Sequence, residues 1–141
     1  MSGFFKISEA TVLALHAMIY ISNHPDRMVS TKEIAEFHHA SEAHLSKVMQ
    51  RLVKAGFIKS IRGPKGGFKV VKEPCKISFL DLYELFEGPP ELKKCLLVNQ
   101  VCAEGECIFG NLLEDLNSRI MNYLANTKLS DVLHKTTASV L

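Results

Sequence analysis

The sequence predicts a mostly α-helical fold with a winged helix-turn-helix domain, because three patterns follow one another along the chain. Two stretches with helical spacing of apolar residues begin at serines suited to capping, Ser30 and Ser41. A basic, glycine-rich turn, Arg62–Gly67, then separates two short runs of β-forming residues. A long helix with leucines on one stripe is expected near the C-terminus. Helices followed by a hairpin in this order are typical of the winged helix-turn-helix.

The helices of this domain are predicted in turn from their apolar spacing and their caps. The first runs from about Ser8 to Asn23 and is apolar around most of its circumference, so we expect it to be buried on several sides. Ser30 and Glu33 have the spacing of a capping box at the start of the second helix. The third helix, Ser41–Ala55, is amphipathic and stops before Gly56. In winged helix-turn-helix proteins this third helix reads the DNA.

The hairpin and a fourth helix complete the domain. We expect its strands at Phe57–Ile61 and Phe68–Val71, and the glycines between them permit the positive backbone angles of a turn. A helix is then expected from Ser78 through Glu87, with the serine as its cap. The sequence Gly88-Pro89-Pro90 ends this helix, because proline cannot continue it.

The chain is expected to divide into three parts. Residues 1–88 form the winged helix-turn-helix DNA-binding domain, residues 89–108 a cysteine-rich loop, and residues 109–141 a dimerisation helix with a C-terminal tail. The long helix is expected at Phe109–Asn126, and its leucines must be buried somewhere, which predicts a homodimer. The stretch Leu129–Val140 is expected to form a short helix.

Composition limits the classes of protein that remain. A chain of 141 residues with 47% hydrophobic and 23% charged residues can bury a core, whereas its formal charge of +2 does not by itself indicate a nucleic-acid partner. The apolar stretch Ala10–Ile21 is interrupted by His16 and is too short to span a membrane. No secretory signal is recognisable, so we expect a cytoplasmic protein without a membrane span. We also expect no enzyme, because no phosphate loop, nucleophile motif or carboxylate pair is present.

A polar and cationic face lies opposite the apolar stripe of the third helix. Its members are Ala43, His44, Lys47, Gln50, Arg51 and Lys54. The hairpin extends this surface with the cations Lys59, Arg62, Lys65 and Lys69. Lysine and arginine neutralise phosphates, and the first turns of a recognition helix reach base edges in the major groove. A solvated helix face would explain any one of these residues, but their combination with the capped helices and the basic hairpin favours DNA binding.

Three of the four cysteines lie close together, which is unlike a disulfide framework. Cys95, Cys102 and Cys107 can turn their thiolates toward one point, which favours a soft metal: an iron-sulfur cluster, zinc or copper(I). A metal-free reduced loop or a thiol switch is the alternative, and so is a zinc-stabilised winged helix that binds protein instead of DNA. Cys75 stands apart and is expected to be a small buried side chain.

The run "SEAHLSKVMQRLVKAGFIKSIRGPKGGFKV", with "ALHAMIYIS" before it and "ISFLDLYELFEGP" after it, resembles the IscR and NsrR family of bacterial repressors over almost the whole chain. The resemblance implies a homodimer that binds a roughly palindromic operator in double-stranded DNA. It also implies a [2Fe-2S] or [4Fe-4S] cluster on the three cysteines that responds to redox state, nitric oxide or iron-sulfur status. By position, Ser46 matches the family's base-discriminating residue and Arg62 its wing arginine. IscR-like proteins can carry glutamate at the first position, so serine is expected to alter the operator sequence.

The residues expected to contact DNA are Ser41, Ala43, His44, Ser46, Lys47, Arg51, Arg62, Gly63 and Lys65.

The fourth cluster ligand is left open by the resemblance. The family's ligating histidine and aspartate would fall at Gly110 and Val12, and neither can bind a metal through its side chain. His16 and Glu9, presented by the first helix of the partner subunit, are the candidates that we name, although a lone histidine in an apolar helix is also typical of a packed core residue. Further candidates are Glu104, Glu106, a thiol cofactor and an open iron site.

Overall fold

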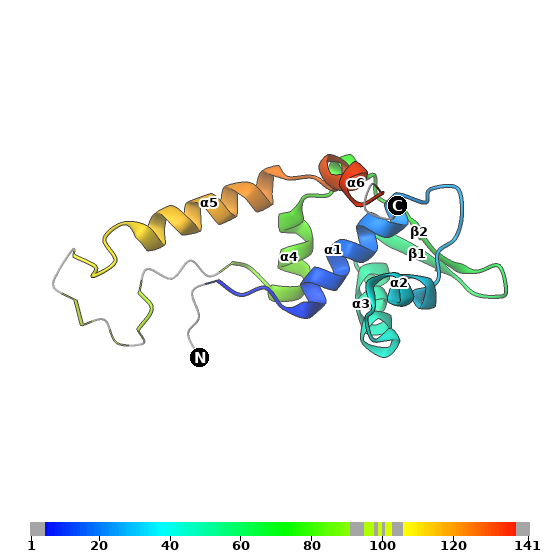
Figure 1. Cartoon of the computed structure of the whole chain (residues 1–141), viewed down its shortest axis with the longest axis horizontal. Coiled ribbons are helices and arrows are strands. Elements are labelled where there is room, and N and C mark those ends of the chain that lie inside the picture. The colour runs from blue at the N-terminus through cyan, green and yellow to red at the C-terminus, as the bar shows by residue number, and fades with distance from the viewer. Residues whose placement is uncertain (1–4, 91–94, 98, 100, 103–105, 138–141) are drawn as a thin grey trace.

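The computed structural model describes residues 5–90, 95–97, 99, 101–102 and 106–137, and it confirms a mostly helical fold with a two-stranded antiparallel sheet (Figure 1). The elements in chain order are α1 Glu9–Ser22, α2 Thr31–His38, α3 Glu42–Lys54, β1 Ile58–Ile61, β2 Gly67–Val70, the 3-10 helix η1 Pro74–Lys76, α4 Phe79–Glu87, α5 Leu112–Asn126 and α6 Leu129–Thr137. Each predicted helix and strand is found, with ends shifted by a few residues, and η1 was not predicted.

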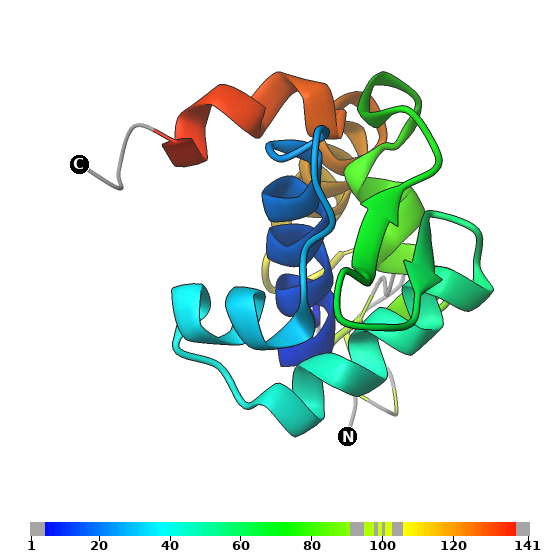
Figure 2. The same cartoon turned by 90° about the vertical axis from the view of Figure 1, so that its right-hand side faces the viewer.

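Helix α1 forms the centre of the winged domain. Figure 2 looks from the hairpin end and shows α1 upright, with α2 and α3 below it and the hairpin to its right. Small and flexible side chains let the other helices approach closely, and Ala14, Ala17 and Met18 are fully buried. The predicted burial on several sides is confirmed except along one strip, where Val12 and His16 are exposed.

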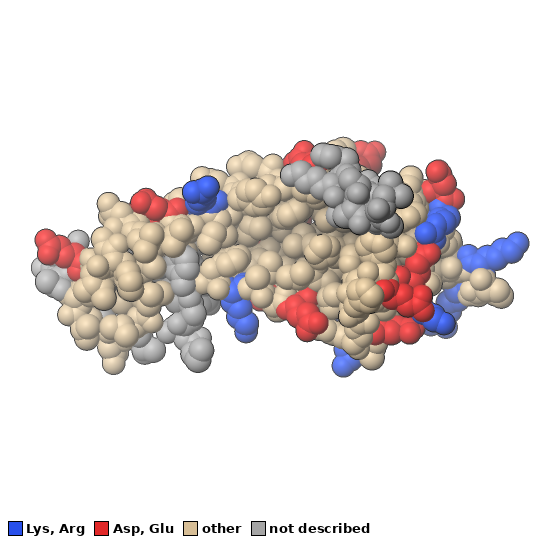
Figure 3. All heavy atoms as spheres, in the orientation of Figure 1, with Lys and Arg blue, Asp and Glu red and all other residues tan. Residues whose placement is uncertain are grey.

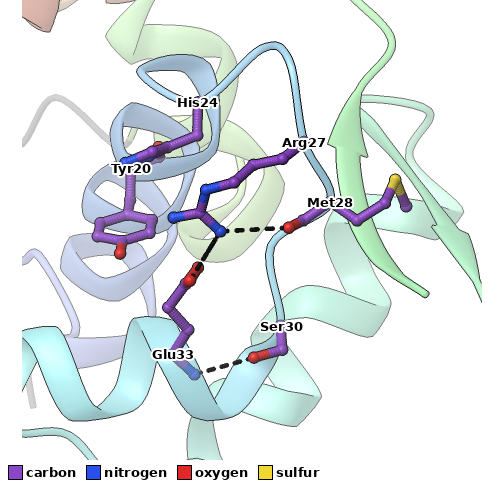
Figure 4. A network of polar contacts seen from close by, with 6 residues as sticks. All are labelled: Tyr20, His24, Arg27, Met28, Ser30 and Glu33. Atoms are coloured by element: carbon purple, nitrogen blue, oxygen red, sulfur yellow. Dashed lines mark hydrogen bonds and ion pairs between the residues drawn. The ribbon is translucent and has the colours of Figure 1, made fainter. Parts of the chain in front are cut away.

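The loop between α1 and α2 is held by an arginine that sequence spacing did not reveal (Figure 4). Ser30 caps α2 as predicted, its Oγ accepting from the Glu33 backbone N–H at 3.1 Å. The Glu33 carboxylate does not return to the cap. It accepts from Arg27 Nη1 at 2.7 and 2.8 Å, and this hydrogen bond raises the pKa of Arg27 above its usual value. Half of the predicted capping box is therefore replaced by an ion pair across the loop.

The same loop is joined to the hairpin by backbone pairing. The Val29 N–H donates to the Phe68 carbonyl at 3.0 Å, and the Phe68 N–H donates back at 2.7 Å. This close approach explains Gly67, whereas contacts within the hairpin turn explain Gly66. A Cβ on Gly66 would lie 2.0 Å from the Ile61 carbonyl oxygen, and one on Gly67 would lie 2.7 Å from the Val29 carbonyl oxygen. A larger residue at Gly67 would push the hairpin away from the α1–α2 loop, and a larger residue at Gly66 would distort the hairpin turn itself.

Helix α4 begins with a complete capping box. Ser78 Oγ accepts from the Asp81 N–H at 3.1 Å, and Asp81 Oδ2 accepts from the Ser78 N–H at 2.9 Å. The helix ends at Gly88, whose φ of 81° suits a residue without a Cβ. Its start and end are thus set by local sequence, as predicted.

Helix α5 leads back to the winged domain from the far end of the molecule (Figure 1). It begins three residues later than expected, because residues 109–111 form a turn. After α5, the Phe79 N–H donates to the Thr127 carbonyl at 2.9 Å, and the Leu129 N–H donates to the Ile77 carbonyl at 2.9 Å. Leu129 is fully buried, so α6 belongs to the winged domain's core. Within the described residues, no helix combines the length and the apolar character needed to cross a membrane.

Candidate nucleic-acid interface and cysteine loop

Helix α3 is fixed with one face in the core and the other open. Ser41 caps it as predicted, its Oγ accepting from the His44 N–H at 3.3 Å. The buried side is formed by Leu45, Val48, Met49 and Leu52. The opposite side exposes Ala43, Lys47, Gln50 and Lys54. The amphipathic pattern therefore identified the free face of this helix correctly.

A hollow of about 340 Å³ lies between α3 and the hairpin. It brings together two residues singled out from the sequence, Ser46 on the helix and Arg62 on the hairpin. The remaining lining residues are Gln50, Val53, Lys54, Ser60 and Phe68. Ser60 was not anticipated, although strand alternation from Ile58 could have placed it beside the helix. The two apolar lining residues are half-buried, whereas the polar and charged ones other than Ser46 are exposed, which suits a surface that receives a charged, hydrogen-bonding partner.

The hairpin concentrates positive charge. Lys59 and Lys69 are directly opposite each other in the antiparallel register, where like charges destabilise a strand pair. Arg62 and Lys65 lie exposed at the turn. Figure 3 shows lysine and arginine side chains projecting at the right-hand end of the molecule, where Figure 1 places the hairpin tip. An anion bound along the hairpin would offset this repulsion.

Arg51 differs from the other cations of α3, because its guanidinium is held against α4. Its Nη2 donates to the Leu85 carbonyl at 2.5 Å, and its Cζ lies 4.5 Å from the centre of the Phe86 ring. The sequence placed Arg51 on the polar face, but it could not reveal this partner from a helix 34 positions away.

The two proposed fourth ligands both lie exposed on α1. Glu9 Oε2 is 3.8 Å from Nδ1 of His44 in α3. The ring centre of His16 is 5.1 Å from that of His38, whose pKa is lowered by burial and by the neighbouring His16. His16 is not the packed core residue that its apolar surroundings in the sequence suggested as an alternative.

The cysteines of the loop are free thiols and half-buried. Cys95, Cys102 and Cys107 form a donor set suited to a soft metal, but among the residues that the structure describes no three ligating side chains are gathered at one point. Cys107 Sγ accepts from the Phe109 N–H at 3.4 Å. Glu106 is exposed, whereas Glu104 lies outside the described residues.

The expectation that Cys75 is buried is wrong. This residue lies in η1, the turn that the sequence did not predict, and it is exposed. Its Sγ lies 3.7 Å from Glu73 Oε2. The short 3-10 turn directs the thiol to solvent, away from the core that Ile77 enters two residues later.

The fold, the cationic hairpin and the open recognition helix agree with a comparison to known families. Residues 7–135 match the Rrf2 model, which is described as an iron-dependent transcriptional regulator. The chain belongs to the Rrf2 family. Rrf2 proteins are transcription regulators that bind DNA, and this chain is accordingly a DNA-binding regulator and not an enzyme.

Relatives of this Rrf2 protein cover nearly its full length. An HTH-type transcriptional regulator of Aquifex aeolicus is 36% identical over 130 residues, which are 90% of each chain. The structure of CymR, the global cysteine regulator of Bacillus subtilis, superposes with a TM-score of 0.74 at 28% identity, covering 93% of this chain and 98% of that one. The structure of T. potens IscR gives a TM-score of 0.69 at 26% identity, covering 94% and 88%.

Proposed function

We propose that this chain is a sequence-specific repressor that binds a roughly palindromic operator as a homodimer. The observation that carries the proposal is the hollow between α3 and the hairpin, which joins Ser46 and Arg62 beside a strand pair of opposed lysines. A helix of this width fits the major groove, and a cationic wing can follow the adjacent backbone or enter a groove.

The proposed contacts divide between the helix and the wing. From α3 and its cap they are Ser41, Ala43, His44, Ser46 and Lys47, and from the hairpin they are Arg62, Gly63 and Lys65. Arg51, which the sequence also placed among the DNA contacts, is left out because its guanidinium is bound to α4. Ser46 in the lining of the hollow is the residue proposed to discriminate bases, because a hydroxyl can donate to or accept from a base edge. Lys47 is proposed to meet a phosphate or a base edge.

The proposed regulation uses an iron-sulfur cluster on Cys95, Cys102 and Cys107. When bound, the cluster would supply an iron centre that reacts with oxidants or nitric oxide. Three thiolates suit such a cluster, and the exposed position of His16 and Glu9 on α1 allows either side chain to reach a second subunit. We propose that His16 of the partner subunit, or Glu9 of the partner subunit, completes the site. The likeness to IscR supports this assignment.

Colour separates the cluster from the alternatives. Protein purified without oxygen should be brown, with broad visible absorbance from sulfur-to-iron charge transfer and with iron and sulfide in comparable amounts. A colourless protein that contains zinc would favour a zinc-stabilised module, and a colourless metal-free protein would favour a thiol-based regulator. A colourless, metal-free protein would fit the likeness to CymR, a cysteine regulator.

DNA recognition is tested with DNA selected from a random pool by the wild-type protein. Arg62→Ala should weaken binding to the selected DNA by about 1–3 kcal/mol if this side chain meets bases or a narrow groove, and should reduce the salt slope if it meets phosphate. Lys76→Ala is the matched control, because Lys76 is an exposed cation in η1 with Glu73 as its partner at 3.5 Å. Unchanged binding by the Arg62 variant would refute the proposed wing contact.

A further inference from the structure

The last turn of α4 occupies a position between the cysteine loop and the DNA-reading helix. Leu85, Phe86 and Glu87 are the final residues of this helix, and the loop departs directly after Gly88. This turn is hydrogen-bonded to two other helices. Arg51 of α3 donates to its Leu85 carbonyl, and Thr11 of α1 donates to its Glu87 carboxylate. Any change in the direction of the loop at Gly88 therefore acts first on this turn.

Arg51 fastens α3 to this turn through a group that has no partner within its own helix. The last carbonyls of a helix lack intrahelical donors and form the negative end of its dipole. The Gly88 N–H donates to the Glu84 carbonyl at 2.9 Å, and Arg51 Nη2 donates to the next carbonyl, that of Leu85, at 2.5 Å. The guanidinium also lies over the Phe86 ring at 4.5 Å, so its plane is held on two sides.

Glu87 fastens α1 to the same turn. Its Oε1 accepts from the Ser8 N–H at 2.6 Å and from the Thr11 hydroxyl at 2.6 Å. Thr11 is fully buried, so this carboxylate satisfies a hydroxyl that has no access to water. One turn earlier, the Tyr83 hydroxyl donates to the Lys6 carbonyl at 3.0 Å, and its ring stacks on Phe5. The start of α1 and the last turn of α3 are thereby tied to one turn of α4.

From this arrangement we infer that Arg51 is a positioning residue, through which the state of the cysteine loop sets the position of α3, and not a DNA contact. The inference rests on the proposed function, because it assigns a route for the regulation proposed there. An arginine on an open helix face would otherwise be free to meet phosphate. Here its donors are already directed at α4, with geometry that lysine cannot reproduce.

The test measures whether α3 responds to the loop without using DNA. In a Cys75→Ser background, the loop cysteines are either left reduced or alkylated with iodoacetamide, and hydrogen exchange is followed in peptides from α3. We expect alkylation to change α3 exchange in the Cys75→Ser protein, which is the reference and is otherwise wild type, and this response to be lost when Arg51→Met or Arg51→Lys is added. Lys54→Met, which removes an outward cation of the same helix, is the matched control and should respond as the reference does.

Each result of this test is decisive for the inference. An unresponsive α3 in the reference protein, or an equal response in the Arg51 variants, would overturn it. Arg51→Lys keeps the charge and the stem, so it should fold even if Arg51→Met does not, and thermal unfolding separates a loss of stability from a loss of response. Binding of the wild type to its selected DNA tests the proposed function separately.

A second readout distinguishes positioning from phosphate contact. If Arg51 positions α3, Arg51→Lys should lower affinity for the selected DNA while leaving the salt slope as in the wild type. If Arg51 meets phosphate, the lysine should largely preserve affinity, and Arg51→Met should reduce the slope by about one. The latter pattern would contradict the inference.

Discussion

At the scale of single residues, the features that matter most here are charged side chains whose partners lie in another element: six positions away for Arg27, and 34 or more for Arg51 and Glu87. Arg27, Arg51 and Glu87 each bind a group that composition and spacing do not identify. Each also restrains an element of the DNA-binding domain: α2, α3 and α1 respectively. Their energetic effects should therefore be visible both in stability and in DNA affinity.

Glu87 should make the free energy of unfolding fall as the pH is lowered through the acid range. Burial raises the pKa of this carboxyl, but the hydrogen bonds from Ser8 and Thr11 outweigh that effect and hold the pKa below its usual value. A depressed pKa in the folded state stabilises above the unfolded-state pKa, and this stabilisation is lost as pH falls through the folded-state pKa. The free energy of unfolding of the wild type should therefore fall across the acid range.

Glu87→Gln should be less stable than the wild type at neutral pH and should lose less stability on acidification. Denaturant unfolding at a series of pH values measures both effects. Glu84→Gln, an exposed carboxylate on the same helix, is the control and should leave the pH profile unchanged. Parallel profiles for Glu87→Gln and the wild type would contradict this account of the carboxylate.

Gly66→Ala should distort the hairpin. The added Cβ would lie 2.0 Å from the Ile61 carbonyl oxygen, a backbone atom that cannot move alone. Overpacking of this kind costs about 1–3 kcal/mol, and the turn that presents Arg62 should shift with it. Unfolding and DNA binding should both be weakened, whereas Lys65→Ala in the same turn should have the smaller effect on either. Equal effects of the two substitutions would argue against a steric requirement for glycine.

At the scale of elements, α5 has more apolar surface than the single chain covers. Leu113 and Leu124 are buried, but Leu112 is 48% exposed, Leu116 37% and Tyr123 57%. The exposed side chains form a stripe beside the buried ones, as the helical spacing predicted. A second subunit is the partner that we propose for this stripe, and dimerisation stays a prediction.

Replacing Leu116 and Ile120 together with aspartate should convert the dimer into monomers and abolish specific DNA binding, because two half-sites must be read at a fixed spacing. Light scattering measures the mass, and circular dichroism checks that the helices persist. Ser118→Asp adds charge to the same helix on the side away from the stripe and should leave the dimer intact. An intact dimer in the double variant would refute this interface.

At the scale of the whole molecule, the cysteine loop is placed between two elements that must move together. It follows α4 directly and leads to α5, whose far end is bound back to α4 through Thr127 and Phe79. Binding a cluster through three points of the loop would restrict the movement of the loop, and with it the movement of α4 and α5, which it connects. A ligand shifts such an equilibrium only by its differential affinity for the two arrangements, which sets an upper limit to the coupling.

Loss of the cluster should therefore change operator affinity by about 5- to 150-fold while leaving non-specific binding almost unchanged. Cluster-loaded, cluster-free and Cys102→Ala proteins would be titrated without oxygen, at fixed salt, on selected and scrambled DNA. Cys75→Ser, which removes an exposed thiol outside the loop, is the control and should follow the wild type. Equal affinities of all the proteins for the selected DNA would mean that the cluster does not regulate binding.

The local sequence by itself determined the order and type of the elements and the free face of the recognition helix. Ser41, Ser78 and Gly88 act within a few residues of their own position, so their effects could be predicted from spacing alone. Ser46 and Arg62 were named by their position in the family resemblance, and the tertiary structure brings both into the lining of one hollow.

Only the tertiary structure decided which partners the polar side chains take. Glu33 has a local cap within reach but binds Arg27, and Arg51 has the pattern of a DNA contact but binds the end of α4. Cys75, which was expected to be buried, is exposed, and so is His16, for which a packed core position was the alternative to a ligand role. Helical and strand periods report which face is buried, whereas a charged group pairs with whichever donor or acceptor the fold brings within hydrogen-bonding distance. That distance depends on how separate elements and loops pack against one another, which no local pattern records.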